Sequence, residues 1–395
     1  MKFIKQIFKY RGKKRTKALK SSHKGKTQSN HLQMNHAEEV SCGNTSHSMD
    51  STTTDIVDQK SLPPTEKPEN PLSLTINVAK KENKGEDADP LIVCQDHMFV
   101  VGVFDGMGGA GASEYTTSNG THTGAYFASR RVQHACNEFF RTRSYPFDID
   151  KLKTSIKQTL DNYIIEYNIK PSGLRGGIIR TLPTTLAIIL AQKHGNGTQV
   201  TSYWCGDSRN YILTAKGLMQ VSTDHLTKPQ DPLENLRNDE SLSNCVCQDK
   251  NFSIAEFDCG NYSEPLILLS ATDGCFGYLR SPMHFEYILL KSLQDSQTID
   301  EWQSRIEDEL RPISGDDFSL GLIMIDKNFD YWRKTLANRL TELEEKYIHP
   351  IKRMEERIEN AQKEVDEAKK AQYDGIDTLW SDYKQSFMLK KDNDR

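Results

Sequence analysis

Four stretches of the sequence place an acidic residue beside a glycine or at the edge of an apolar segment. The most prominent is Asp105-Gly106, which follows the apolar and β-branched run 100–104. The others are Gly85-Glu86-Asp87, Asp273-Gly274 after the run 266–272, and Gly315-Asp316-Asp317 before the run 318–325. Such runs predict buried strands, and an acid at the end of a buried strand is costly unless a cation neutralises it.

These acids predict a site for hard metal ions. Taken singly, an Asp-Gly pair is more often a turn than a ligand, but four at strand ends form a stronger signal. Several carboxylates share a small volume only when cations hold them there. Because these four acid-glycine stretches contain no His or Cys, an oxygen-only set favours Mg²⁺ or Mn²⁺ over zinc. Two such ions about 4 Å apart would activate a water and hold a phosphoryl group for in-line attack.

Composition limits the class of protein. Of the 395 residues, 36% are apolar and 27% charged, which indicates a globular core diluted by polar tails. The net charge of −4 predicts no nucleic-acid partner. The eight cysteines form no CxxC pair, so we expect reduced thiols in a cytoplasmic protein. No apolar run approaches the roughly 18 residues that a membrane-spanning helix needs.

The N-terminal region divides into two polar parts. Residues 1–35 carry eleven Lys and Arg and no acid, and Phe3, Ile4, Ile7 and Phe8 share one helical face. This pattern is typical either of a solvated basic tail or of a short helix that lies on an anionic membrane surface. Residues 36–70 are rich in Ser, Thr, Asn, Asp and Pro, which predicts a disordered linker.

Residues 71–327 alternate between strand and helix patterns. We expect short strands near 72–78, 99–104, 184–191, 200–205, 210–214, 218–222, 266–271 and 318–325. We expect helices over 113–141, 152–167, 282–293 and 298–310, the last opened by a capping box of Thr298 and Glu301. Groups of helices around antiparallel strands predict a layered α+β domain.

Residues 328–395 predict a helical C-terminal extension. Apolar residues recur there at spacings of four and three, in the manner of a coiled coil, at Trp332, Leu336, Leu340, Leu343, Tyr347, Ile351, Met354, Ile358, Ala361, Val365 and Ala368. Pro350 interrupts the pattern, so we expect two helices joined within 347–351. These helices either fold back on each other or bind another chain, as a protein partner or by self-association.

The order and the residue types of five motifs resemble those of the metal-dependent Ser/Thr protein phosphatase family (PPM, type 2C), in a bacterial-like variant with DGMGG. The resemblance spans about residues 75–326, and the motifs are Phe104-Asp105-Gly106-Met107-Gly108-Gly109, Thr184-Thr185, Gly206-Asp207-Ser208-Arg209 with Thr223-Asp224-His225, Ser270-Ala271-Thr272-Asp273-Gly274, and Asp316-Asp317-Phe318-Ser319.

This resemblance implies a four-layer αββα sandwich, in which two antiparallel sheets are flanked by helices. It also implies two Mn²⁺ or Mg²⁺ ions and a phosphoprotein substrate, whose phospho-Ser or phospho-Thr a metal-activated water would attack. Asp105, Asp273 and Asp316 would be the catalytic metal ligands. The carbonyl of Gly106, Glu86 and the supporting Asp87 would complete the metal set, whereas Asp207, Ser208, Arg209 and His225 would be structural.

The sequence departs from the family pattern at three places. Glu82 stands where many members carry an arginine that grips phosphate. Met107 stands where many members have a histidine proposed as general acid, and methionine cannot donate a proton. Pro183 replaces a glycine before Thr184. The Glu82 difference supports an alternative interpretation, a pseudophosphatase that acts as a binding module through its C-terminal helices.

Overall fold

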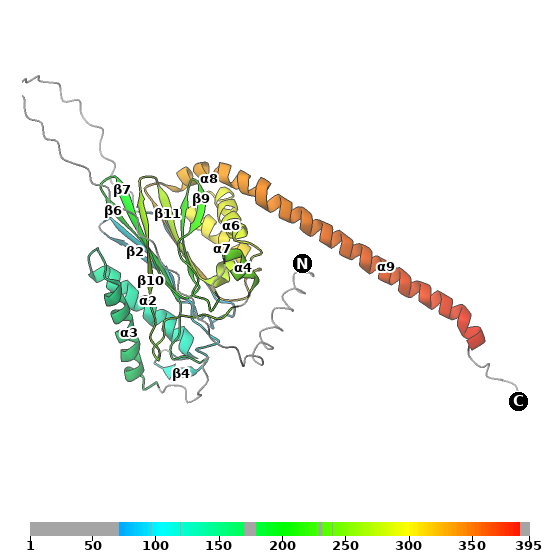
Figure 1. Ribbon diagram of the computed structural model, residues 1–395, viewed down its shortest axis with the longest axis horizontal. Helices are drawn as coiled ribbons and strands as arrows, with labels where there is room; N and C mark the ends of the chain where they lie inside the picture. Colours follow the sequence, from blue (N-terminus) through cyan, green and yellow to red (C-terminus); the bar gives the residue numbers. More distant parts are fainter. Residues whose placement is uncertain are drawn as a thin grey trace, which may run out of the picture. The chain divides into compact units, whose positions relative to one another are not determined.

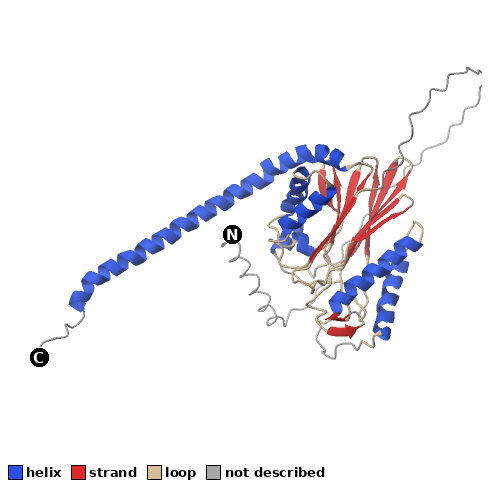
Figure 2. Cartoon of the chain, turned by 180° about the vertical axis from the view of Figure 1, so that it is seen from behind, coloured by secondary structure: helices blue, strands red, loops and turns tan. Residues whose placement is uncertain are grey.

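The computed structural model describes residues 71–95, 97–118, 120–169, 179–228, 231–238 and 240–387. The predicted basic tail (1–35) and linker (36–70) lie outside the described residues. The described chain builds two sheets, a hairpin and helices on both sides of the sheets (Figures 1 and 2).

Two five-stranded sheets form the centre of the domain, and all their pairings are antiparallel. The first sheet runs in the order β1 (Ser73–Val78), β12 (Phe318–Ile325), β11 (Leu266–Ala271), β8 (Arg209–Thr214) and β9 (Gly217–Gln220). The second runs β10 (Ala255–Tyr262), β7 (Gly197–Cys205), β6 (Leu186–His194), β3 (Met98–Val103) and β2 (Leu91–Gln95).

The burial of each strand follows its place in these sheets. The edge strand β1 alternates, with Leu74, Ile76 and Val78 buried and the residues between them exposed. Every residue of β3, β11 and β12 is buried, because one face packs on the opposite sheet and the other on helices. Continuous apolar runs in the sequence therefore mark the central strands, as expected for strands covered on both faces.

Helices cover the outer face of each sheet. The helices are α2 (Gly124–Thr142), α3 (Ile149–Glu166), α4 (Pro232–Arg237), α5 (Asp273–Phe276), α6 (Pro282–Gln294), α7 (Ile299–Leu310), α8 (Phe329–Leu343) and α9 (His349–Phe387). One apolar cluster joins α2 and α3 to the second sheet, another joins α6, α7 and α8 to the first, and a third lies between the sheets. The predicted αββα sandwich is confirmed (Figure 1).

The segment 113–123 is a hairpin and not the start of a helix, so the expectation of one helix over 113–141 was wrong. Strands β4 (Glu114–Thr117) and β5 (Gly120–Thr123) pair there, and α2 begins only at Gly124. Thr123 caps α2, since its side chain accepts a hydrogen bond from the Tyr126 N–H. β-Branched threonines at 116, 117, 121 and 123 favour strand over helix, which explains the difference.

The C-terminal region separates into two helices with different surroundings. A single π-helical turn, Glu344–Ile348, joins α8 to α9 near the expected junction. Pro350 is the second residue of α9 and directly follows the π-helical turn, so the irregular hydrogen bonding falls at the proline and the chain stays helical through it. In α8, Trp332 and Leu336 are fully buried in the cluster of the first sheet, whereas α9 has no buried residue.

No helix within the described residues is long and apolar enough to cross a membrane.

The seven described cysteines are all free, and Cys136, Cys205, Cys247 and Cys275 are buried. Buried thiols of this kind pack as small apolar side chains.

Shortening a side chain of α8 should destabilise the whole domain. Leu336 is fully buried, so Leu336→Ala should lower the free energy of unfolding by about 2–5 kcal/mol through lost burial and a residual cavity. Ile165→Ala, which shortens a side chain that is 77% exposed on α3, is the matched control and should cost less than about 0.5 kcal/mol. Urea denaturation measures both, and equal losses would contradict the inclusion of α8 in the core.

Candidate metal centre

Three of the predicted acids lie beside strand ends at the same end of the sandwich. Asp105 follows β3 by two residues, Asp273 is the first residue of α5 after β11, and Asp316 precedes β12 by two residues. Since β11 and β12 pair antiparallel, with Ala271 opposite Leu320, the end of one strand adjoins the start of the other. The Ser270 hydroxyl donates to the Val101 carbonyl of the opposite sheet at 3.4 Å, which ties β11 to β3 just before the two acids.

The acids raise one another's pKa values. Burial raises the pKa of Asp105 well above its ordinary value, and neighbouring carboxylates raise it further, namely Asp87, Asp273, Asp207 and Asp316. Burial, reinforced by Asp317, raises the pKa of Asp87 to about 7. Burial and Asp273 raise the pKa of Asp207 to about 8. Carboxylates in this condition repel one another when ionised, which is the situation that a bound cation relieves.

Glu86 is held at both its backbone and its side chain. Its N–H donates to Asp317 Oδ2 at 2.7 Å, and its carbonyl accepts from the Ser129 hydroxyl at 2.5 Å and from Arg130 at 3.3 Å. The Thr123 hydroxyl donates to its carboxylate, so the last residue of the β4–β5 hairpin orients this acid. Burial raises the pKa of Glu86, as do Asp317 and Asp316.

The glycines of the motif make room for Glu86. A Cβ on Gly108 would lie 1.8 Å from Glu86 Oε2, and a Cβ on Gly106 would lie 2.5 Å from the Glu86 carbonyl oxygen. By contrast, a Cβ on Gly109 would meet nothing within 4 Å. Gly106 and Gly108 are therefore required for the close approach of the Glu86 segment, whereas Gly109 is not.

Two threonines hold the backbone of Asp105. Its carbonyl accepts from the Thr184 hydroxyl at 2.6 Å and from the Thr185 N–H at 2.8 Å. Thr184 in turn exchanges two backbone hydrogen bonds with Val246, at 2.9 and 3.0 Å. The Thr184-Thr185 motif thus fixes the turn that carries Asp105 and Gly106.

Asp87 and Asp316 differ in exposure. Asp87 is 1% exposed, and the Thr272 hydroxyl donates to its Oδ2 at 3.0 Å. Asp316 is exposed, and its Oδ1 accepts from the Asp317 N–H at 3.0 Å. Asp87 therefore lies behind the cluster, whereas Asp316 lies at its solvent edge.

Asp317 is a site residue to which the sequence assigned no role. Its carboxylate accepts from the backbone N–H groups of Lys80, at 2.6 Å, and Glu86, at 2.7 Å. The Lys80 ammonium group donates to the Ser314 carbonyl. These bonds join the segment 80–86 to the start of β12, and the only signal in the sequence was the adjacency of Asp317 to Asp316.

The motif that contains Arg209 is structural, with one exception. Arg209 makes two hydrogen bonds to Asp224, at 2.8 and 2.6 Å, and both side chains are less than 5% exposed. His225 Nδ1 accepts from the Gly206 N–H at 3.1 Å, and its ring stacks on Trp204. Asp207 is the exception, because burial and then the charge of nearby Asp273 raise its pKa, which places it close to the acidic cluster.

The donor chemistry of the cluster fits hard divalent cations, since all the ligands would be carboxylate or carbonyl oxygens. Within the described ranges, no three His, Cys, Asp or Glu side chains form a group that could hold a metal ion as they stand. Mutual repulsion opposes closer approach of ionised carboxylates, so only a cation would gather these oxygens onto one point.

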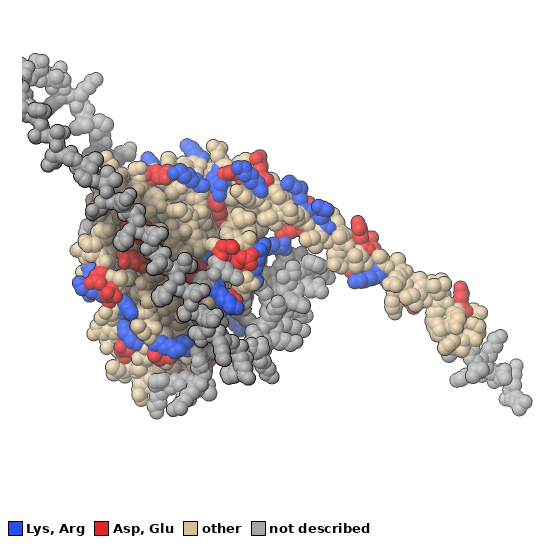
Figure 3. Space-filling model, viewed as in Figure 1, with Lys and Arg blue, Asp and Glu red and all other residues tan. Residues whose placement is uncertain are grey.

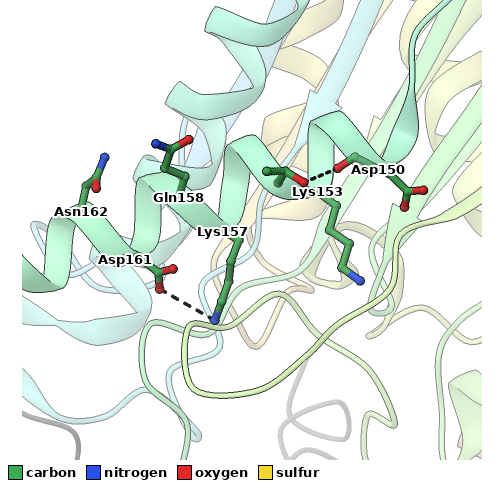
Figure 4. A pocket seen from close by; sticks show the side chains of 7 residues that line it. Asp150, Lys153, Lys157, Gln158, Asp161 and Asn162 are labelled. Carbon is green, nitrogen blue, oxygen red and sulfur yellow. Dashed lines mark hydrogen bonds and ion pairs between the residues drawn. The ribbon is translucent and has the colours of Figure 1, made fainter.

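A separate hollow of about 690 Å³ lies on α3, away from the acids (Figure 4). Its lining residues are Asp150, Lys153, Thr154, Lys157, Gln158, Asp161 and Asn162. Lys157 pairs with Asp161 at 3.9 Å and also donates to the Gln248 carbonyl. The hollow is therefore a polar helix surface that joins α3 to the loop before β10.

Comparison with known proteins finds structural likeness only. No known family and no curated protein matches the sequence. The solved structures that resemble it include the serine/threonine phosphatase Stp1 from Staphylococcus aureus, with 19% identity over 66% of this chain and 96% of that chain and a TM-score of 0.47. PppA, described as a key regulatory component of T6SS in Pseudomonas aeruginosa, shares 19% identity over 65% and 97% of the two chains, with a TM-score of 0.44.

The serine/threonine phosphatase PstP/Ppp of Mycobacterium tuberculosis shares 14% identity over 65% of this chain and 99% of that chain, with a TM-score of 0.44. Likenesses this distant carry no argument about activity. What the chain does must therefore be argued from its own residues.

Removing the carboxylate of Asp224 should destabilise the domain. Asp224→Ala leaves the Arg209 guanidinium buried without its partner, so we expect a loss of about 3–5 kcal/mol in the free energy of unfolding. Glu264→Ala breaks the exposed pair with Lys216 and should cost less than about 1 kcal/mol. Guanidinium chloride denaturation distinguishes the two, and a small loss for Asp224→Ala would contradict a structural role for the pair.

Proposed function

We propose that this protein is a metal-dependent phosphatase that hydrolyses phospho-Ser and phospho-Thr in proteins. The observation that carries the proposal is the convergence of Asp105, Asp273 and Asp316 at one end of the sandwich, where burial raises the pKa of Asp105 and the other two are among the acids that raise it further. The order of the five sequence motifs supports the same assignment. Oxygen ligands without His or Cys match Mn²⁺ and Mg²⁺, the ions that serve phosphoryl transfer.

In this proposal Asp105, Asp273, Asp316, Glu86 and the Gly106 carbonyl would hold two ions, and Asp87 would support them from behind. Two bound ions would supply Lewis acidity, which lowers the pKa of a water and offsets the charge that develops on the phosphoryl group.

The chain's own contribution is to position these groups rigidly. The threonines at 184 and 185 hold the carbonyl of Asp105, so its carboxylate leaves the turn in one direction. Thr272 accepts from the Ser319 N–H at 2.8 Å and donates to Asp87, so one hydroxyl links the start of α5, β12 and the buried acid. Pre-organised groups of this kind need no rearrangement during the reaction.

The solvent edge of the cluster suits a substrate carried on a protein surface. Asp316 and Gly109 are exposed, so a short phosphorylated side chain would reach the acids without entering a deep pocket. Met107 offers no proton, so a water would protonate the leaving oxygen.

Glu82 favours a competing function. It is exposed, and an acid at this position would repel a phosphate dianion. The ammonium group of Lys80 is engaged with the Ser314 carbonyl, and Arg130 donates to the carbonyls of Gly85 and Glu86. If these cations never reach the phosphate, the domain would bind without turnover, as a pseudophosphatase.

The decisive assay is release of phosphate from a phospho-Thr peptide with Mn²⁺, with Mg²⁺ and with EDTA. We expect metal-dependent release, and a loss in kcat of at least about 100-fold in Asp273→Asn, because one ligand oxygen and its charge are removed. Asp308→Asn, an exposed acid on α7, is the matched control and should retain full activity. No release from folded protein with either ion would reject the phosphatase in favour of the binding module.

A second test uses the two neighbouring glycines. Gly108→Ala should displace the Glu86 carboxylate and weaken Mn²⁺ binding by about 10-fold or more, because its Cβ would lie 1.8 Å from Glu86 Oε2. Gly109→Ala meets nothing within 4 Å and should bind Mn²⁺ as the unchanged protein does. Isothermal titration calorimetry measures both affinities. Equal affinity in the two variants would remove Glu86 from the metal set.

A further inference from the structure

The helix α9 presents an apolar surface that nothing in the described chain covers. It runs for 39 residues and none is buried. Its large apolar side chains are 44–71% exposed, and they are Met354, Ile358, Val365, Tyr373, Ile376, Leu379, Trp380, Tyr383 and Phe387. In the view of Figure 3 the distal part of α9 shows mostly uncharged residues. An exposed apolar surface of this length marks an interaction site.

These side chains form one narrow stripe. At 100° per residue they fall within about 120° of the helix circumference, as in a coiled-coil seam. Without Leu379, which lies beside Trp380, and together with two alanines, the positions of the seam are 354, 358, 361, 365, 368, 373, 376, 380, 383 and 387. Successive spacings are four or three, except for a spacing of five at the centre, between Ala368 and Tyr373.

The order of these spacings is the same in both directions along the helix. Reversing the seam about the midpoint between Lys370 and Ala371 places every seam position on another seam position. Two copies of α9 in antiparallel orientation would therefore meet in every layer. A seam that matches its own reverse is the pattern expected for an isologous contact.

The sizes of the side chains also select the antiparallel arrangement. In this register Ala361 would face Trp380 of the second copy, and Ala368 would face its Tyr373. Val365 would face Ile376, Ile358 would face Tyr383, and Met354 would face Phe387. A parallel pair would instead place alanine on alanine and tryptophan on tryptophan, which a uniform helix separation of about 8–10 Å does not accommodate.

The polar residues at the centre of the seam are compatible with the same register. There Lys369 would face Gln372 of the second copy and not a second Lys369.

An anionic lipid surface fits this helix less well than a second copy of the chain does. The segment 349–387 carries seven Lys and Arg against nine Asp and Glu, so it has no positive excess to attract anionic headgroups. Acids such as Glu359, Asp366 and Asp377 border the stripe. These charges fit a protein partner with mixed charges and do not fit an anionic membrane.

The area available is sufficient for a stable dimer. The overlap 354–387 extends for about 50 Å. The four aromatic side chains on each helix, each of roughly 150–250 Å² and about half exposed, would bury roughly 1,000 Å² for two copies before the aliphatic positions are counted. The total reaches the range of standard interfaces, about 1,200–2,000 Å².

We propose that α9 is a dimerisation helix that pairs antiparallel with α9 of a second copy of this chain. The first turns of α9 stay with their own domain, because Glu355 pairs with Arg280 and Lys352 lies over the Tyr287 ring. The paired segment begins among these contacts, at Met354. The proposal does not depend on the phosphatase activity.

The test is sedimentation equilibrium of the full-length protein over a range of concentrations. We expect a dimer, and we expect Ile358→Glu to weaken it at least about 100-fold by placing a charge in the seam. Asn360→Glu places the same charge on the opposite face and should leave the dimer unchanged. Since α9 is unburied, neither variant should alter the unfolding temperature of the domain, which checks that both are folded.

Orientation is tested by exchanging the two side chains of one layer. Ala361→Trp overfills this layer and Trp380→Ala empties it, so each should raise the dimer Kd at least about ten-fold, and the double variant should restore it. In a parallel dimer these positions are 19 residues apart, about 28 Å, and no restoration would occur. A monomer at high concentration, equal loss in Asn360→Glu, or a dimer without restoration would each overturn the proposal.

Discussion

Repulsion among clustered, partly buried carboxylates is the constraint on which the rest of the structure depends. Besides burial, Asp87, Asp207 and Asp273 each raise the pKa of Asp105, and Asp273 also raises the pKa of Asp87 and of Asp207. A flexible chain would relieve this strain by moving the acids into water. They remain together because each is attached to a strand end or turn that the sandwich core holds in place.

The groups that hold the acids are mostly neutral hydroxyls and backbone amides. The hydroxyls of Thr123, Thr184 and Thr272 contact Glu86, the backbone of Asp105 and Asp87 respectively. Neutral donors can orient a carboxylate without cancelling its charge, whereas a lysine or arginine in the same place would compete with a metal ion. Two cationic side chains nearby, Lys80 and Arg130, donate hydrogen bonds to backbone carbonyls instead.

The two C-terminal helices share one sequence pattern but have different surroundings. Heptad-like spacing continues from Trp332 through Val365. In α8 this apolar face completes the layer over the first sheet, and in α9 it remains exposed. The π-helical turn between them shifts the helix face, so the stripe that packs on the domain does not continue as the stripe that we propose for a second copy.

The sequence by itself determined the elements and the type of site. Continuous apolar runs marked β3, β11 and β12, and acids at their ends indicated an oxygen-rich metal site, because strand ends in a sandwich lie at common edges. The heptad spacing predicted the C-terminal helices, although it could not say which of them belongs to the core.

Only the tertiary structure decided which groups act on the acids. Thr123 and Asp317 lie 37 and 231 positions from Glu86, so no local pattern could join them to it. The family resemblance implied a structural role for Asp207, and only the fold places it near Asp273. Local patterns report what a segment prefers, whereas contacts between distant segments depend on how the two sheets pack.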